Sequence, residues 1–268
     1  MASPPPLATS IKGLTFDVFG TTVSWLTTVT SALTTAATTK LTTPPTSLPP
    51  ATLTRLSSLT PTDWTLFASQ WRASYGKFTA TFIQGTTPWK DVDTHHHDSL
   101  VQLLEEWQLS GVYTPQETAQ LSKIWHFLPP WSDSSAGLAR LNKAGFKTAT
   151  LSNGNRALLE DLDAFGELGF QRLISAEDFQ AYKPAREVYL GACAALGLAP
   201  GEVAMVAAHL EDLVAARAAG MRTVYVERPG EEEWDKEEER YGLAREWVDL
   251  WVAEGEGGFE EVARRLGV

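Results

Sequence analysis

Four groups of polar side chains share one feature: each follows a short apolar run, either directly or after one loop. They are Asp17, Ser152 with Asn153, Lys183, and the segment from His209 to Asp212. A carboxylate that ends a buried strand can act as a nucleophile if a nearby cation keeps it ionised. Each position alone also has an ordinary explanation, because an Asp at the end of a strand often caps the next helix. The four positions together favour a catalytic site.

The apolar runs alternate with helix-like segments over residues 133–226. The expected strands are Ile11–Phe16, Lys147–Leu151, Arg172–Ile174, Val203–Ala207 and Thr223–Val226, and the expected helices are Ser134–Ala144, Arg156–Phe165, Pro184–Leu196 and Leu210–Ala219. This alternation is typical of a doubly wound parallel sheet. Sites in such sheets form at the carboxyl ends of the strands. We therefore predict an α/β fold that brings the four polar groups to one edge of the sheet.

A second, helical segment interrupts this alternation directly after the first strand. Helical spacing is found over residues 23–40, 63–82, 100–109 and 115–127, with Thr62 or Asp63 as the N-cap of the second helix. Residues 41–52 are rich in Pro and Thr, and we expect a loop insertion there because proline removes a donor and fixes φ. The predicted domains are an α/β core of residues 11–22 and 128–268 and a helical cap of residues 23–127.

The composition excludes several classes of protein. The chain has 268 residues, enough for a large core, and its single cysteine, Cys193, cannot form an intramolecular disulfide. A formal net charge of −11 has the wrong sign for general nucleic-acid binding, although a local cation can still attract a small anionic substrate. No apolar run approaches the ~20 residues needed to span a bilayer. Because Met1–Thr9 lacks the apolar region of a signal peptide, we expect a cytoplasmic protein.

Four short motifs of the chain resemble those of the haloacid dehalogenase superfamily. They are Asp17-Val18-Phe19-Gly20-Thr21, Leu151-Ser152-Asn153-Gly154, Tyr182-Lys183-Pro184 and the acidic Asp212. The helical insertion after the first motif also matches the cap of that superfamily. The resemblance covers about residues 11–266 and implies its α/β core. Most members are phosphatases, so the resemblance alone leaves the reaction open.

Two departures from the phosphatase pattern narrow the range of reactions that the site could catalyse. Phosphatase relatives carry a second Asp two residues after the nucleophile to protonate the leaving group, and this chain has Phe19 there. A halide needs no proton, so Phe19 is compatible with cleavage of a carbon–halogen bond. Phosphatase relatives also carry an acidic Mg²⁺ ligand where this chain has Ala208. Phosphoryl transfer depends on a cation, so both residues point away from a phosphatase, and we expect neither metal nor cofactor.

Further motifs resemble the (S)-2-haloacid dehalogenase subgroup, the type II haloacid dehalogenases. They are Trp71-Arg72, the Lys183-Pro184 pair with Tyr189, and residues 146–153. The resemblance implies that Asp17 attacks a short 2-haloacid to form an aspartyl ester that water then hydrolyses. It also implies a homodimer formed partly through the cap.

The same resemblance implies a role for each further motif residue. Thr21 and Lys183 support Asp17, Ser152 binds the substrate carboxylate, and Tyr189 belongs to the substrate-binding set. Arg72 and Asn153 cradle the halide, and Asp212 holds Lys183 or the hydrolytic water.

One motif departs from the subgroup. The usual Ser-x-Asn-x-aromatic-Asp reads Ala207-Ala208-His209-Leu210-Glu211-Asp212 here. An imidazole can accept a proton from water near neutral pH, which an amide cannot do, so His209 is a candidate base for hydrolysing the ester, oriented by Asp212 or Glu211. The alternatives are that His209 only hydrogen-bonds Lys183 or a loop carbonyl, and that Asp212 activates the water.

Several residues have simpler readings. Lys183 could be a surface lysine, Arg72 could stack on aromatic rings, and Tyr189 could be core. Adjacent positions of a helix or strand do not share a face, so His95, His96 and His97 cannot converge on one metal ion, and we expect a solvated cap loop there. The charge run 231–240 is expected to be solvated and without chemistry.

Two other functions remain as alternatives to dehalogenation. One is a Mg²⁺-dependent phosphatase acting on a small phosphorylated metabolite. The other is an idle member of the superfamily that serves as a binding protein. The nucleophile and its cation, Asp17 and Lys183, are both present, which argues against an idle protein.

Overall fold

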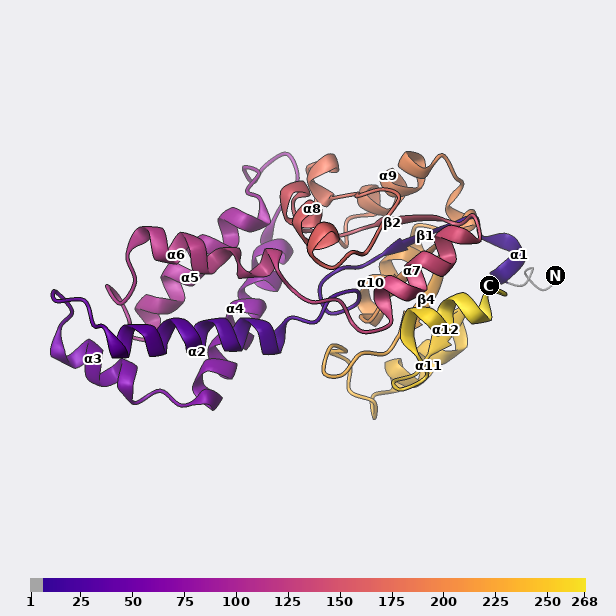
Figure 1. Ribbon diagram of the computed structural model, residues 1–268. Coiled ribbons are helices and arrows are strands. Elements are labelled where there is room, and N and C mark those ends of the chain that lie inside the picture. The colour runs from indigo at the N-terminus through magenta and orange to yellow at the C-terminus, as the bar shows by residue number, and fades with distance from the viewer. Residues whose placement is uncertain (1–6) are drawn as a thin grey trace. The chain divides into compact units, whose positions relative to one another are not determined.

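The computed structural model describes residues 7–268 (Figure 1). Most of the Met1–Thr9 segment considered above for a signal peptide therefore lies outside the described residues. Within residues 7–268, no helix combines the length and apolar character that crossing a membrane requires.

A five-stranded sheet, with every pair of neighbouring strands parallel, forms the centre of the α/β part. Its strands are β1 (Gly13–Phe16), β2 (Lys147–Thr150), β3 (Val203–Ala207), β4 (Arg222–Val226) and β5 (Leu250–Val252), in the order β2-β1-β3-β4-β5. All four residues of β1 and all five of β3 are buried, as the continuous apolar runs predict. The chain leaves β1 toward β2 on one side, while β3 lies on the other. Such a switch point is where doubly wound sheets bind ligands.

The helices are distributed between two parts of the chain. Those within residues 7–24 and 129–268 are α1 (Leu7–Ser10), α7 (Ser134–Lys143), α8 (Arg156–Phe165), α9 (Arg186–Leu196), α10 (Leu210–Ala218), α11 (Glu239–Trp247) and α12 (Gly258–Arg265), with 3-10 turns at Ala176–Phe179 and Pro200–Glu202. Those between β1 and β2 that form a separate bundle are α2 (Leu26–Thr42), α3 (Pro50–Ser57), α4 (Pro61–Thr81), α5 (Val92–Glu106) and α6 (Pro115–Ser122), with a 3-10 turn at Lys123–His126. The mixture of a parallel sheet and helices confirms the predicted α/β class.

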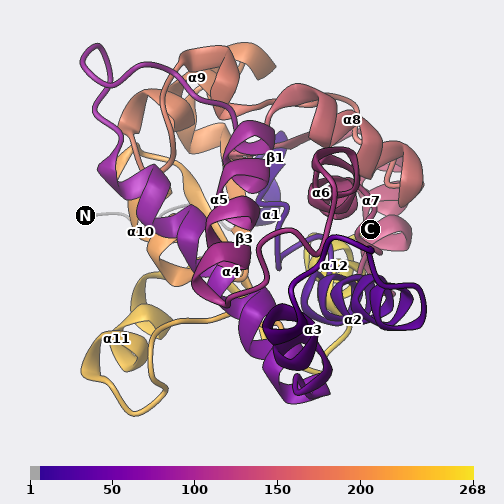
Figure 2. The ribbon, with the colours of Figure 1, turned by 90° about the vertical axis from the view of Figure 1, so that its left-hand side faces the viewer.

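The contacts divide the described chain into two compact units. The first, the core unit, comprises the residues up to Ser24 together with Pro129–Val268, and the second, the cap unit, comprises Trp25–Leu128. In the cap unit, α4 packs against both α2 and α5, and α5 packs against α6 (Figure 2). The buried side of α4 includes the aromatic residues Trp64, Phe67 and Trp71.

Residues 172–174 do not form the predicted strand. The segment runs beside β2 but pairs with it only through isolated bridges, Ala149 to Arg172 and Ser152 to Ser175. Between them, the Thr150 hydroxyl accepts from the Ile174 N–H at 2.8 Å and donates to the Ile174 carbonyl at 3.0 Å. Because a side chain takes both backbone groups of Ile174, the regular backbone ladder is interrupted.

The boundaries of the Pro-rich loop also differ from the prediction for residues 41–52. Helix α2 continues to Thr42, and α3 begins at Pro50. Proline is tolerated at a first helical position, where its missing N–H has no partner within the helix anyway. The N-cap of α4 is Thr60 rather than Thr62 or Asp63, and Asp63 instead completes a capping box with Thr60.

The histidine triplet lies in helix α5, so the predicted solvated loop is wrong. The Asp91 side chain caps that helix by accepting from the Thr94 N–H at 2.7 Å. His95 is buried and stacks on Phe78 with ring centroids 4.4 Å apart, and His96 is buried as well. Aromatic packing inside the cap unit offsets the removal of these rings from water, a tertiary effect that local polarity does not reveal.

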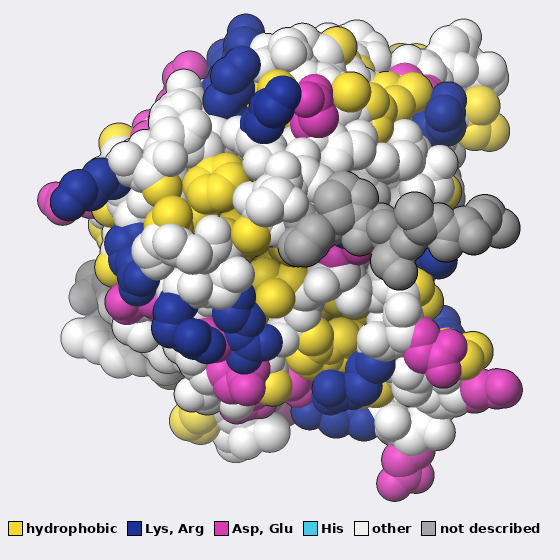
Figure 3. All heavy atoms as spheres, turned by 90° about the vertical axis from the view of Figure 1, so that its right-hand side faces the viewer, with side chains coloured by type: hydrophobic (Ala, Val, Ile, Leu, Met, Phe, Trp, Pro, Cys, Tyr) yellow, Lys and Arg dark blue, Asp and Glu magenta, His cyan; other side chains and the backbone are white. Residues whose placement is uncertain are grey.

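Figure 3 shows the face of the core unit near the C-terminus of the chain. Basic and acidic side chains are interspersed with hydrophobic ones on this face.

Candidate active site

Asp17 begins the loop after β1 and is held from both its backbone and its side chain. Its N–H donates to the Val206 carbonyl of β3 at 2.9 Å, and its carbonyl accepts from the Thr22 hydroxyl at 2.7 Å. Its Oδ2 accepts from the Thr21 hydroxyl at 2.7 Å, and Thr21 in turn accepts from the Ala208 N–H at 2.9 Å. These bonds fix the carboxylate at the carboxyl ends of β1 and β3.

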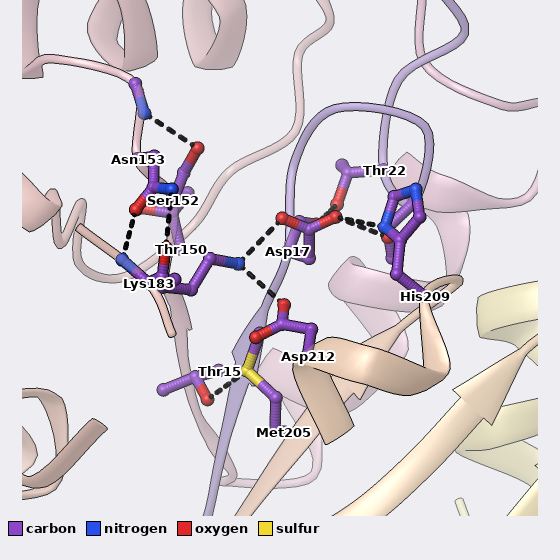
Figure 4. Close-up of polar contacts among 12 residues, drawn as sticks. Thr15, Asp17, Thr22, Thr150, Ser152, Asn153, Lys183, Met205, His209 and Asp212 are labelled. Atoms are coloured by element: carbon purple, nitrogen blue, oxygen red, sulfur yellow. Dashed lines mark hydrogen bonds and ion pairs between the residues drawn. The ribbon is translucent and has the colours of Figure 1, made fainter. Parts of the chain in front are cut away.

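Lys183 lies between two carboxylates (Figure 4). Its Nζ is 2.8 Å from Asp17 Oδ1 and 2.6 Å from Asp212 Oδ2. The other oxygen of Asp212 accepts from the hydroxyl of Tyr189 at 2.6 Å. The three charged side chains are only 9–11% exposed, so the water-excluding surroundings strengthen their attraction.

Asn153 joins the loop of Lys183 to the end of β2. Its Oδ1 accepts from the Lys183 N–H at 2.7 Å, and its Nδ2 donates to the Lys183 carbonyl at 3.3 Å. Ser152 is 1% exposed, and its hydroxyl accepts from the Gly154 N–H at 3.1 Å. In this structure both side chains therefore brace the loops around Asp17, and their roles toward substrate and halide stay predictions.

His209 is the N-cap residue of α10 and lies on the opposite side of Asp17 from Lys183 (Figure 4). Its Nδ1 is 3.2 Å from Asp17 Oδ2, and its Nε2 is 3.6 Å from Glu231 Oε2. Asp212 and Glu211 were the orienting partners expected from the sequence, but Asp212 is engaged by Lys183 and Glu211 is exposed. The nearby acidic partner of His209 is instead Glu231.

The charges determine the protonation state of Asp17 and Lys183. Burial raises the pKa of Asp17, but the Lys183 charge and a hydrogen bond from His209 outweigh it and hold that pKa well below its usual range. Burial lowers the pKa of Lys183, and the two carboxylates outweigh burial and raise it above its usual range. Asp17 is therefore an ionised carboxylate paired with an ammonium, a state suited to nucleophilic attack.

The loop of residues 17–22 rests on a buried arginine. Arg228 is 6% exposed, and its Nε donates to the Thr21 carbonyl at 3.0 Å. Its other two nitrogens bind the carboxylate of Asp133 at 2.6 and 2.8 Å. Because the guanidinium is bonded on both sides, it couples the loop of residues 17–22 to the start of α7.

The residues around Asp17 do not fit Mg²⁺. Mg²⁺ requires octahedral oxygen ligands, whereas Ala208 supplies a methyl group at the position of the acidic ligand named above. Both oxygens of Asp17 already accept from a hydroxyl or lie against a cation. Among residues 7–268, no group of His, Cys, Asp and Glu has the arrangement of a metal site.

Arg72 lies on α4 in the cap unit, separate in the chain from the residues that surround Asp17. Its guanidinium carbon lies 4.9 Å from the centroid of the Tyr75 ring, a cation–π contact. The other sequence-predicted site residues belong to the core unit. They are Asp17, Thr21, Ser152, Asn153, Lys183, Tyr189, His209 and Asp212.

Sequence reasoning missed two residues near Asp17. Glu231 belongs to the charge run that was interpreted as solvated, yet its side chain is only 10% exposed. Its position in the loop after β4 was a usable signal, because the other candidates were found by the same rule. Arg228, in the same loop, gave no local signal, since a single arginine has no periodicity.

Comparison with known proteins places this site in a family. The family model of haloacid dehalogenase-like hydrolases matches residues 11–220. The chain belongs to the haloacid dehalogenase-like hydrolases. This confirms the resemblance seen in the four motifs.

Individual relatives of this haloacid dehalogenase-like hydrolase are named 2-haloacid dehalogenases. (S)-2-haloacid dehalogenase 1 from Pseudomonas sp. (strain CBS-3) is 36% identical over 111 residues, which are 41% of this chain and 49% of that protein. (S)-2-haloacid dehalogenase 4A from Burkholderia cepacia is 34% identical over 113 residues, again 41% and 49%. The chain thus spans about half the length of these relatives.

Solved structures match over almost the whole chain. An L-2-haloacid dehalogenase is 31% identical with a TM-score of 0.76, covering 96% of this chain and 100% of that one. A defluorinating L-2-haloacid dehalogenase is 29% identical with a TM-score of 0.76, covering 96% of each chain.

Proposed function

We propose that this haloacid dehalogenase-like hydrolase cleaves the carbon–halogen bond of short 2-haloacids without a metal ion. The observation that carries the proposal is an ionised Asp17 paired with Lys183, with Phe19 where a phosphatase needs a proton donor. The relatives named above support the same substrate class, because they are named for their action on 2-haloacids.

The proposed reaction has two steps. An oxygen of Asp17 attacks the carbon that bears the halogen, the carbon–halogen electron pair leaves with the halide, and an ester forms with inversion at carbon. Water then attacks the carbonyl carbon of that ester. The bond between this carbon and the ester oxygen breaks, so a 2-hydroxyacid leaves and the Asp17 carboxylate is restored.

Other residues are proposed to bind the substrate. Ser152 receives its carboxylate, Arg72 and Asn153 receive the departing halide, and Tyr189 lines the site. The net charge of −11 repels an anion, so local cations such as Arg72 have to reverse the field.

The assembly and location of the protein are also proposals. We infer a cytoplasmic homodimer formed partly through a cap of residues 23–127, binding neither nucleic acid nor membrane, with the family resemblance and the acidic composition in support. Light scattering of the purified chain tests the dimer, and fractionation of cells that express it tests the location.

Halide release tests the function directly. The purified enzyme is incubated with a panel of 2-haloacids, with and without EDTA, beside a generic phosphatase substrate. We expect halide release that EDTA leaves unchanged and that Asp17→Asn abolishes. Phosphate release that EDTA stops would establish the phosphatase alternative, and no release of either ion would leave the idle binding protein.

A further inference from the structure

His209 has an acidic partner on the side away from Asp17. The Glu231 carboxylate lies 3.6 Å from His209 Nε2, an ion-pair distance, while Nδ1 is 3.2 Å from Asp17 Oδ2. Catalytic contacts of this length are common in enzymes without bound substrate and shorten in the complex. The imidazole therefore lies between the nucleophile and a second carboxylate.

Packing holds Glu231 in this position. A Cβ added at Gly20 would lie 2.0 Å from Glu231 Oε2, so the carboxylate rests directly on the backbone of the nucleophile loop. Glycine is favoured at position 20 both by this close approach and by its φ of +82°, which lies in the left-handed region. The carboxylate of the next residue, Glu232, accepts from the Leu210 N–H at 2.8 Å and so ties the Glu231 loop to the first turn of α10, beside His209.

Asp212 is poorly placed to be the base. Both of its oxygens already accept hydrogen bonds, one from the Lys183 ammonium at 2.6 Å and one from the Tyr189 hydroxyl at 2.6 Å. Accepting a proton from water at either oxygen would compete with one of these two bonds. His209 has a ring nitrogen directed at Asp17 itself.

We propose that His209 is the general base that hydrolyses the Asp17 ester and that Glu231 is its positioning residue. This inference rests on the proposed function. In the resting enzyme, carboxylates face both ring nitrogens, which favours a proton on each. Forming the ester removes the charge of Asp17, so the imidazole loses the proton at Nδ1 while Glu231 retains the one at Nε2.

The proton count then balances. Nδ1 accepts a proton from the water that attacks the ester carbonyl carbon, giving a tetrahedral intermediate. As the acyl carbon–oxygen bond breaks, the same proton passes to the leaving oxygen of the 2-hydroxyacid. The new Asp17 carboxyl group returns its own proton to Nδ1, so the net products are the hydroxyacid, the halide and one proton.

Stopped-flow halide release, with mass spectrometry of the intact enzyme, tests the base. His209→Asn, which introduces the residue usual in the subgroup, should release the first equivalent of halide near the wild-type rate. Later turnover should fall between about 10²- and 10⁴-fold, with esterified enzyme accumulating. Normal turnover without detectable ester would show that His209 is not the base and make Asp212 the candidate.

Glu231→Gln tests the positioning role. Turnover should fall at least about tenfold, again with ester accumulation, because the imidazole loses the group that orients it. The double variant with His209→Asn should be no slower than His209→Asn alone, since Glu231 acts only through the ring. Additive losses would contradict this. Glu233→Gln, an exposed charge in the same loop, is the matched control and should behave as wild type.

A substrate-independent measurement separates this inference from the proposed function. In wild type, the ring ¹⁵N shifts of His209 should report a proton at Nε2. They should move toward the Nδ1-protonated form in Glu231→Gln and remain unchanged in Glu233→Gln. Identical shifts in wild type and Glu231→Gln would disprove the pairing. A wild-type enzyme that releases no halide would overturn the proposed function and the base role together, whatever the shifts.

Discussion

The ionised state of Asp17 depends on the cation beside it. Its carboxylate is buried, which by itself favours the neutral form, and the Lys183 ammonium at 2.8 Å reverses that preference. Asp17 is therefore ionised throughout the neutral range because of a partner 166 residues later in the chain.

Replacing Lys183 should change how the first step depends on pH. Lys183→Met keeps most of the side-chain volume but removes the charge, so the pKa of Asp17 should rise. The rate of the first halide release, level in wild type as the pH is lowered from 8 to 5, should then decline within that range. The rate at neutral pH should also fall by about 10²-fold or more. Single-turnover halide release checks this, with the exposed Lys143→Met as control. A level profile in Lys183→Met would contradict the assigned electrostatics.

Replacing Tyr189 tests whether this residue positions Asp212 or binds the substrate. Its ring is fully buried, and its hydroxyl donates to Asp212, so Tyr189→Phe should lower kcat about three- to tenfold and leave KM unchanged. The variant also removes the hydrogen bond that Asp212 Oδ1 accepts, which should lower the free energy of unfolding by about 1 kcal/mol. Steady-state kinetics and urea denaturation measure both. A raised KM with unchanged kcat would instead support the substrate-binding role implied by the family resemblance.

At the scale of elements, helices α7 and α12 together hold Arg228, the side chain that binds the loop of residues 17–22. Arg228 binds Asp133 just before α7, and the Phe259 N–H of α12 donates to the same carboxylate at 2.7 Å. The two helices approach so closely that a Cβ at Gly137 would lie 2.5 Å from the Phe259 carbonyl carbon. The loop of residues 17–22 thus depends on a glycine contact between two helices that are far apart in sequence.

A pair of glycine substitutions tests that contact. Gly137→Ala should lower the free energy of unfolding by about 1–3 kcal/mol, because the added methyl meets the backbone of α12. Gly242→Ala, in α11 with nothing within 4 Å of the added carbon, should raise it by about 0.5–1 kcal/mol. Urea midpoints of the two variants should move in opposite directions. A Gly137→Ala variant with a higher free energy of unfolding would mean that α12 shifts to admit the methyl group without loss of stability.

At the scale of the whole molecule, the chain combines a sheet unit that contains Asp17 with a helical unit that contains Arg72. The parallel sheet positions the first set of residues by a general rule, since the carboxyl ends of its strands share one edge. The cap unit carries buried aromatic and histidine side chains whose packing maintains its own helices.

Substitutions of Arg72 test whether the cap unit takes part in the reaction. If it receives the halide, Arg72→Lys should lower kcat/KM by about tenfold or more, because lysine keeps the charge but lacks the planar set of donors. The free energy of unfolding should change by less than about 1 kcal/mol, since the side chain is only partly buried. Halide-release kinetics and urea denaturation measure both. An unchanged rate in Arg72→Ala would leave the contact with Tyr75 as its role.

Part of this protein was predictable from local sequence alone. Apolar runs followed by turn residues predicted β1 and β3, and the helix over Arg156–Phe165 was predicted with its observed bounds. Because strand ends in a parallel sheet meet at one edge, the same pattern predicted that Asp17 and His209 would be neighbours. These features depend on periodicity and chain connectivity, which a sequence displays directly.

Only the tertiary structure decided which side chains face one another within that edge. Glu231 rather than Asp212 lies beside His209, and Tyr189 faces Asp212. It also decided that His95 and His96 are buried in a helix and not solvated in a loop. Loop paths and side-chain directions follow from packing between segments distant in the chain, such as Gly20 beneath the carboxylate of Glu231. Such contacts leave no periodic pattern in the sequence, because the packed surroundings select them and local propensity does not.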